Sequence, residues 1–158
     1  MSADDADHEV GSAVAVGVAG EKGVAGLLEG AQLTGHAAES GGAGRDVMTG
    51  GLGADLFTFH DGDFGGNTTS TADRILDFSA AQADRFHLSA IDANANTAAN
   101  EAFSFIGTAA FSGTAGQLRD FQQAGDTFFA GDLTGDGAAD FMVRVVGLHT
   151  LTSGNFVL

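Results

Sequence analysis

The stretch that decides the fold reads GGAGRDVMT at residues 41–49 and GGLGADLFT at residues 50–58. It is one nonapeptide written twice in direct succession, with glycine at its first, second and fourth positions, aspartate at its sixth and an apolar residue at its eighth. The three glycines indicate a tight turn, because glycine adopts positive φ angles without steric cost. The residues after the aspartate then form a short strand that points Met48 or Phe57 into the core.

The composition of this turn favours a calcium site. A glycine-rich turn lets backbone carbonyl oxygens point toward a common centre, and Asp46 or Asp55 adds a carboxylate at the end of the turn. Ca²⁺ takes about six to eight hard oxygen ligands, which such a turn supplies. A plain glycine-rich hairpin is the structural alternative. A phosphate-binding loop is disfavoured, because no Gly-Lys-Ser or Gly-Lys-Thr follows the glycines.

Charge and composition narrow the classes of function. The chain has 158 residues, enough for one domain, and its 21 acidic and 6 basic side chains give a net charge of −15. This balance excludes nucleic acid as a partner, since binding it requires clustered Lys and Arg. The acidic side chains repel one another in a compact state, so a bound dication would couple metal binding to folding. With no cysteine, neither disulfides nor thiolate metal sites are available.

Targeting signals of the usual kinds are not expected. The opening MSADDADHEV has no apolar region of the type that makes a signal peptide. No apolar run approaches the ~20 residues of a membrane span, so we expect no such span.

The flanking regions predict a β-rich protein. Residues 1–40 contain glycines but no aspartate at the matching offset, and they fit either degenerate repeats or a loosely ordered arm. We predict strands at 56–59, 103–106, 118–123, 127–131 and 141–146, the last three forming a meander with a hairpin turn at 124–126. The 13 phenylalanines, with no Trp or Tyr, predict a core built around Phe.

A second cation candidate lies at residues 132–140. Asp132, Thr134 and Asp136, followed by Gly137 and Asp140, imitate the start of an EF-hand loop. The position of the closing glutamate holds Val143, which lies in an apolar strand. An Asp-Gly hairpin turn is the alternative interpretation.

Catalytic motifs are missing. The five histidines form no HExxH, and no serine lies in a GxSxG elbow, so we predict no enzymatic activity for this chain. The carboxylates of Asp120 and Glu101 are interpreted as solvated surface charges.

Four segments in order carry a family resemblance: GGLGADLFTF, ADRILDFSAAQADRFHLSAIDA, AFSFIGTAAFSGTAGQLR and GDLTGDGAADFMVRVVGLHTLTSGNFVL. From about residue 41 to 158 the chain resembles the C-terminal domain of serralysin-type secreted bacterial metalloproteases, a domain shared with other RTX exoproteins. The resemblance implies an all-β fold, a short parallel β-roll capped by a β-rich C-terminal meander. It divides the chain into residues 1–40 and a calcium-binding domain at residues 41–158.

The resemblance also implies the calcium ligands. These belong to the second glycine, the fourth-position glycine and the aspartate of each turn, and each turn shares its ion with a turn one coil away. An aspartate-rich stretch of the family corresponds to residues 83–89, where Asp84 matches and His87 replaces an aspartate. We expect roughly one to three ions. The predicted ligands are Gly42, Gly44, Asp46, Gly51, Gly53, Asp55 and Asp84, with Asp132, Asp136 and Asp140 from the second candidate.

Export by a type I transporter that reads the C-terminus is the functional implication. The family's signal ends in an acidic residue followed by apolar ones, and here Asn155 replaces the acid before Phe-Val-Leu. The expected protein is a secreted, extracellular, monomeric calcium-binding module without catalytic activity. The alternatives are an ancillary domain of a secreted metalloprotease or polysaccharide-modifying exoenzyme, and an adhesive protein bridged by calcium.

Overall fold

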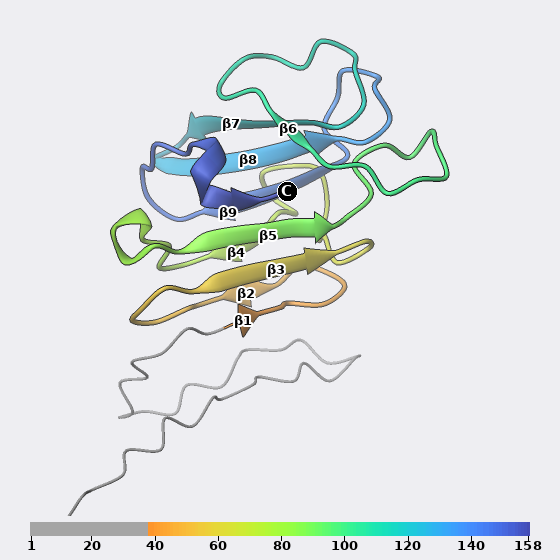
Figure 1. The fold of residues 1–158 in the computed structure, drawn as a ribbon. Helices are drawn as coiled ribbons and strands as arrows, with labels where there is room; N and C mark the ends of the chain where they lie inside the picture. The colour runs from red at the N-terminus through yellow and green to blue at the C-terminus, as the bar shows by residue number, and fades with distance from the viewer. Residues whose placement is uncertain (1–37) are drawn as a thin grey trace, which may run out of the picture.

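The computed structural model describes residues 38–158, so the prediction of degenerate repeats or a loosely ordered arm over residues 1–40 falls almost wholly outside the described part. Residues 38–158 form ten strands and two 3-10 helices, η1 (Ala80–Gln82) and η2 (Ser153–Asn155) (Figure 1). Within residues 38–158, no helix is long and apolar enough to cross a bilayer. The strands are β1 (Ala38–Glu39), β2 (Val47–Met48), β3 (Leu56–His60), β4 (Asp73–Ile75), β5 (Arg85–Ala90), β6 (Ser104–Phe105), β7 (Gln117–Gln123), β8 (Asp126–Asp132), β9 (Phe141–Val145) and β10 (Phe156–Val157).

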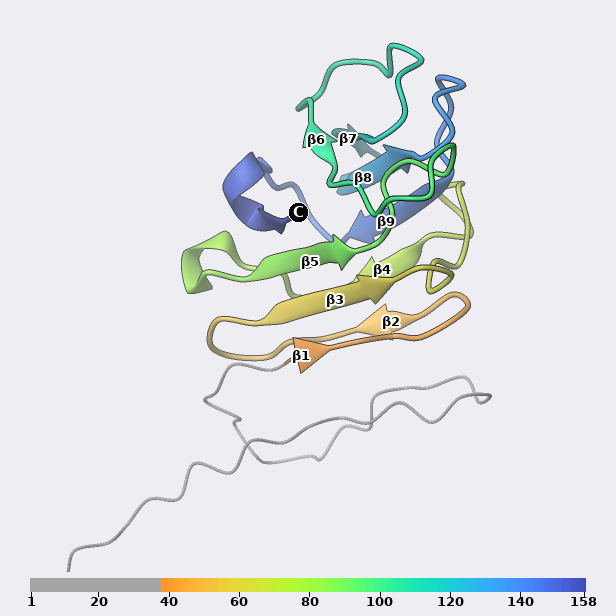
Figure 2. The same ribbon diagram turned by 45° about the vertical axis from the view of Figure 1, so that its right-hand side comes forward.

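The first five strands form a parallel β-roll. The chain alternates between two sheets, so that β1, β3 and β5 pair in parallel in one sheet and β2 pairs in parallel with β4 in the other (Figure 2). Each of β2 to β5 carries one or two inward apolar side chains, because successive residues of a strand face opposite sides. Met48 and Phe57 are 2 % and 0 % exposed, which confirms the inward eighth position of the repeat.

The β-rich cap is a direct continuation of the roll. β9 pairs in parallel with β4, and β8 and β7 then extend the same sheet in antiparallel order, giving the order β2-β4-β9-β8-β7-β6. A two-residue turn joins β7 to β8 at Ala124 and Gly125, with φ of 53° and 87°, as a hairpin of this length requires. These observations confirm the predicted roll and meander, and add that one sheet runs through both.

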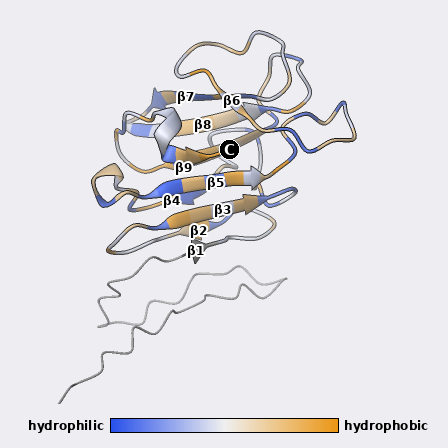
Figure 3. Ribbon diagram, in the orientation of Figure 1, coloured by the Kyte–Doolittle hydropathy of each residue, from blue (hydrophilic) through white to orange (hydrophobic). Residues whose placement is uncertain are grey.

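Phenylalanine dominates the core between the two sheets. Phe86 lies 4.6 Å from Phe78, 4.7 Å from Phe129 and 5.4 Å from Phe156, measured between ring centroids. Hydrophobic colour runs along β3 and β9, which face this core (Figure 3). The prediction of a core built on Phe is confirmed.

The interpretation of Asp120 as a surface charge is wrong. Asp120 is only 5 % exposed and lies opposite Phe129 in the β7–β8 ladder, and burial raises the pKa of its carboxyl. The two faces of β7 explain the error. Arg119 and Phe121 lie at a second, outer apolar cluster that includes Phe128, while Leu118 belongs to the main core, so each face of β7 has one apolar residue and packs against an apolar cluster.

Candidate metal centre

Four turns connect the strands of the roll, and each ends in an aspartate that either precedes the next strand directly or is its first residue. We name them the first turn (41–46), second turn (50–55), third turn (65–73) and fourth turn (79–84). Because the roll alternates between its two sheets, the first and third turns lie together at one side and the second and fourth at the other. The closing aspartates are Asp46, Asp55, Asp73 and Asp84, and the apolar residue two positions later is Met48, Phe57, Ile75 and Phe86, all buried.

The same hydrogen bond links the turns on each side. The amide of Asp46 donates to Asp73 Oδ1 at 2.9 Å, and the amide of Asp55 donates to Asp84 Oδ1 at 2.9 Å. The other oxygen of each accepting carboxylate binds the first residue of its own turn. Gly65 N donates to Asp73 Oδ2 at 3.3 Å, and Ser79 N donates to Asp84 Oδ2 at 2.8 Å. The third and fourth turns are therefore structural equivalents of the two repeats.

The repeat glycines serve two different steric purposes. The glycines at the second and fourth positions of each repeat adopt positive φ, as the sequence predicted. Their φ angles are 75° for Gly42, 107° for Gly44, 93° for Gly51 and 114° for Gly53. The first glycines are needed for space. A Cβ on Gly50 would lie 2.5 Å from Asp55 Oδ2, and a Cβ on Gly41 would lie 2.5 Å from the Cβ of Asp46. The closing aspartate of each repeat thus lies directly against its first glycine.

Three carboxylates gather between the first and third turns. The pKa of Asp73 is raised to about 6, chiefly by burial; the charges of Asp46 and Asp63 add to the increase, and hydrogen bonds from the amides of Asp46 and Gly65 oppose it. Burial and the charge of Asp63 likewise raise the pKa of Asp46. Asp46 Oδ2 is buried and has no hydrogen-bond partner among the described residues. Asp63 accepts the backbone amide of His60 at 2.8 Å and lies 3.1 Å from its ring Nδ1, whereas no ion pair among residues 38–158 involves Asp46 or Asp73.

The amides of the second turn are bound by side chains from the coil that follows. Gly50 N donates to Asp77 Oδ1 at 2.9 Å and Gly51 N to Asp77 Oδ2 at 2.7 Å, while Gly53 N donates to Gln82 Oε1 at 2.7 Å. Asp77 and Gln82 were not among the predicted site residues. The second and fourth turns are consequently fixed against each other by both carboxylate and amide side chains.

Sequence reasoning also missed Asp63 and Asp73. A signal for Asp73 was present, since Asp73-Arg-Ile75 and Asp84-Arg-Phe86 reproduce the sixth to eighth positions of the repeat. The spacing along the chain made this signal hard to recognise. Asp46 and Asp73 are 27 residues apart and Asp55 and Asp84 are 29 apart, because the third and fourth turns follow longer connections than the repeats do. Nothing local in the sequence marks Asp63, which approaches from the loop before the third turn.

The donor set of these turns fits a hard cation. Asp46 Oδ2 has no hydrogen-bond partner among the described residues, and the carboxylates of Asp63 and Asp73 are close enough to affect or be affected by its charge. No group of three or more His, Asp or Glu side chains within residues 38–158 is close enough to hold a metal by side chains alone. A cation here would therefore need backbone carbonyl oxygens from the glycine turns as well, which Ca²⁺ accepts.

The predicted site at residues 132–140 is a hairpin loop closed by its own carboxylates. Asp132 accepts the amides of Gly135 at 2.6 Å and Gly137 at 3.0 Å. Asp140 Oδ2 accepts the amide of Leu133 at 2.6 Å, and Asp136 accepts one amide within the loop. Asp132 is the last residue of β8, and Asp136 and Asp140 lie in the connection to β9, far along the chain from the four turns. Metal binding by this loop stays a prediction.

Comparison with known proteins identifies the domain type. A profile of the family described as peptidase M10 serralysin C terminal matches residues 13–158. Comparison with curated proteins finds no match.

Two solved structures from the Azotobacter vinelandii mannuronan C5-epimerase are similar. The AlgE6R2 subunit has 27 % identity and a TM-score of 0.50, over 78 % of this chain and 71 % of that one. The AlgE6R3 subunit has 26 % identity and a TM-score of 0.48, over 77 % of this chain. This chain covers 62 % of that subunit's length. The family match spans most of the sequence and agrees with the observed roll, so the chain belongs to the serralysin C-terminal domain family of peptidase M10 proteins.

Proposed function

We propose that this chain is a calcium-binding β-roll module without catalytic activity, which folds when calcium binds. The observation that supports it most is the Asp46 carboxylate between the first and third turns, whose Oδ2 is buried without a hydrogen-bond partner among the described residues. The pKa of Asp73 on the facing turn is raised to about 6. A dication on this side of the roll would stabilise the ionised form of both carboxyl groups and so lower their pKa values.

The ligand assignment follows the turns. On one side we assign Gly42, Gly44 and Asp46, with Asp73 facing them from the third turn. On the other side we assign Gly51, Gly53 and Asp55, with Asp84 facing them from the fourth turn. Bound calcium supplies positive charge that offsets the carboxylates and holds the turns of successive coils together. The chain's own contribution is the glycine backbone that lets the carboxylates approach, as at Gly41 and Gly50.

Folding and export are connected in this proposal. A chain with a net charge of −15 remains unfolded where calcium is scarce, and a type I transporter that reads its C-terminal region carries it out. Extracellular calcium at about millimolar concentration then drives folding of a secreted monomer. The family and the similar epimerase subunits favour a related role, in which the module is an ancillary domain of a larger metalloprotease or polysaccharide-modifying exoenzyme.

Isothermal titration with CaCl₂ tests the assignment directly. We expect heat of binding for the natural chain, and a lower ion count or an affinity reduced about tenfold or more for Asp46→Ala and for Asp55→Ala. Asp61→Ala is the matched control, because the Asp61 side chain is exposed and accepts a hydrogen bond from the amide of Asp92, outside the four turns. Equal titration curves for all three variants would refute the ligand assignment.

A further inference from the structure

The residues after β9 return to the roll and close it. We call residues 151–158 the closing segment. It contains η2 (Ser153–Asn155) and β10, which pairs in parallel with β5 so that Phe156 lies opposite Phe86. Phe156 is 3 % exposed, and its ring lies 5.4 Å from Phe86 of the roll and 5.4 Å from Phe129 of the cap. The closing segment therefore packs where the roll and the cap meet.

Arg85 connects the closing segment to the turns. Its Nε donates to the carbonyl of Gly154 at 3.2 Å and its Nη2 to the carbonyl of Phe156 at 2.9 Å. Its backbone amide donates to the carbonyl of Asp55 at 2.9 Å. Arg85 directly follows Asp84, which closes the fourth turn. One residue thus has its backbone held by the second turn and its side chain bound to the closing segment.

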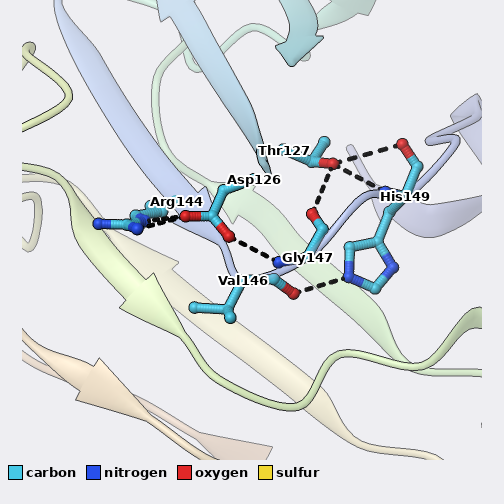
Figure 4. A network of polar contacts seen from close by, with 6 residues as sticks. All are labelled: Asp126, Thr127, Arg144, Val146, Gly147 and His149. Atoms are coloured by element: carbon cyan, nitrogen blue, oxygen red, sulfur yellow. Dashed lines mark hydrogen bonds and ion pairs between the residues drawn. The ribbon is translucent and has the colours of Figure 1, made fainter. Parts of the chain in front are cut away.

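The residues just before the closing segment are anchored separately, on the cap. Asp126 pairs with Arg144 and accepts the amide of Gly147 at 2.8 Å (Figure 4). Thr127 Oγ1 accepts the amide of His149 at 2.8 Å and donates to the carbonyl of Gly147 at 3.0 Å. No residue of the four turns takes part in these bonds, so this anchor does not depend on a cation.

We propose that calcium binding between the second and fourth turns controls docking of the closing segment, and that Arg85 is the residue that couples the two. When the turns are unformed, the Arg85 donors are not aligned with the carbonyls of Gly154 and Phe156, and β10 has no edge to pair with. The closing segment then keeps the anchor at its start and the contact of Phe156 with Phe129 of the cap, but loses its hydrogen bonds to the roll. This inference rests on the proposed function.

The consequence concerns recognition of the chain. Residues 155–158 correspond to the part of the family that the resemblance assigns to export. In the folded protein they are paired to β5 and Phe156 is buried. In this proposal the closing segment is accessible before the turns form and is covered once they have formed.

Hydrogen exchange detected by mass spectrometry tests the coupling in the intact chain. In saturating calcium we expect the peptide covering residues 151–158 to exchange about tenfold faster in Arg85→Ala than in the natural chain, since hydrogen bonds from a charged donor shift an opening equilibrium by about that factor. The peptide covering β8 should exchange equally in both. Arg119→Ala is the matched control, because Arg119 lies on β7 and contacts Phe111 and Phe121. Arg85→Lys should restore protection only partly, since a single ammonium replaces two separate donors.

The outcomes separate the two proposals. If calcium induces β-structure but residues 151–158 are equally protected in Arg85→Ala and the natural chain, the coupling is wrong and the calcium module stands. If residues 151–158 of the natural chain are equally protected with and without calcium, the coupling is also wrong. If calcium changes neither circular dichroism nor exchange anywhere in the chain, the proposed function fails and the coupling fails with it.

Discussion

Acidification should favour folding of the calcium-free chain, and Asp73 should account for a measurable part of the effect. The pKa of Asp73 is about 6 in the folded protein against an ordinary value of 3.8. The folded chain therefore holds a proton that the unfolded chain has already lost over this pH range. For a raised acid pKa the sign is fixed: the group costs nothing below 3.8, and its cost grows as the pH rises to the folded value.

The magnitude follows from those two values. One pKa unit corresponds to about 1.4 kcal/mol, so the full cost at pH 7 is at most about 3 kcal/mol. Between pH 5 and pH 7 the cost increases by about 1 kcal/mol. Asp73→Asn keeps one oxygen to accept the Asp46 amide and removes the charge. Asp73→Asn should therefore not show the increase of about 1 kcal/mol between pH 5 and pH 7. At every pH it should be less stable by about 1 kcal/mol, because its side-chain NH₂ group cannot accept the hydrogen bond from Gly65 N.

The assay is circular dichroism in excess chelator at pH 5, 6 and 7, with an excluded osmolyte added to bring the transition into range. In the natural chain, the free energy of folding should become less favourable from pH 5 to pH 7. The same change in pH should destabilise Asp73→Asn by about 1 kcal/mol less than it destabilises the natural chain. The other ionisable groups are the same in both chains, so the difference between the two pH dependences isolates the contribution of Asp73. Asp61→Asn should behave as the natural chain does. The same pH dependence in the natural chain and in Asp73→Asn would refute the account of this side of the roll.

Two further substitutions probe the turn and the hairpin. Gly50→Ala should destabilise the calcium-bound protein by about 1–3 kcal/mol, because the new Cβ would meet Asp55 Oδ2 at 2.5 Å. In Gly154→Ala the nearest atom is 3.6 Å away, so equal urea midpoints for these two variants would contradict the steric argument. Asp140→Ala should lower the free energy of unfolding by about 1–3 kcal/mol, since it leaves loop amides of the hairpin without an acceptor. An ion count by mass spectrometry then decides the loop's other role: an unchanged count excludes Asp140 as a ligand, and a count lowered by one supports the loop as a metal site.

The repeat could be interpreted from sequence because its chemistry is local. Each turn is specified by glycines and an aspartate within six residues, so the turns and the inward Met48 and Phe57 follow without knowledge of the rest of the chain. The partners of those turns could not be predicted in the same way. Asp73 and Asp77 reach the repeats from 27 residues along the chain, through connections whose length no local pattern fixes.

The cap shows the same limit. The β7–β8 hairpin is local and was predicted within a residue or two, whereas the pairing of β4 with β9 joins segments far apart in the sequence. Asp120 was misplaced because β7 has apolar clusters against both faces, so alternation along the strand did not reveal which side was buried. This also makes Asp120 an unsuitable neutral control, since its removal would alter a buried site.

Far-UV circular dichroism of the purified 158-residue chain, recorded in excess chelator and again after titration with calcium, tests the central claim most directly. We predict little β-structure in chelator at neutral pH, and a cooperative gain of β-structure on adding calcium, with a midpoint that moves to higher calcium in Asp46→Ala. A chain that shows full, cooperatively melting β-structure in chelator, with no change in spectrum or melting temperature when calcium is added, would contradict it.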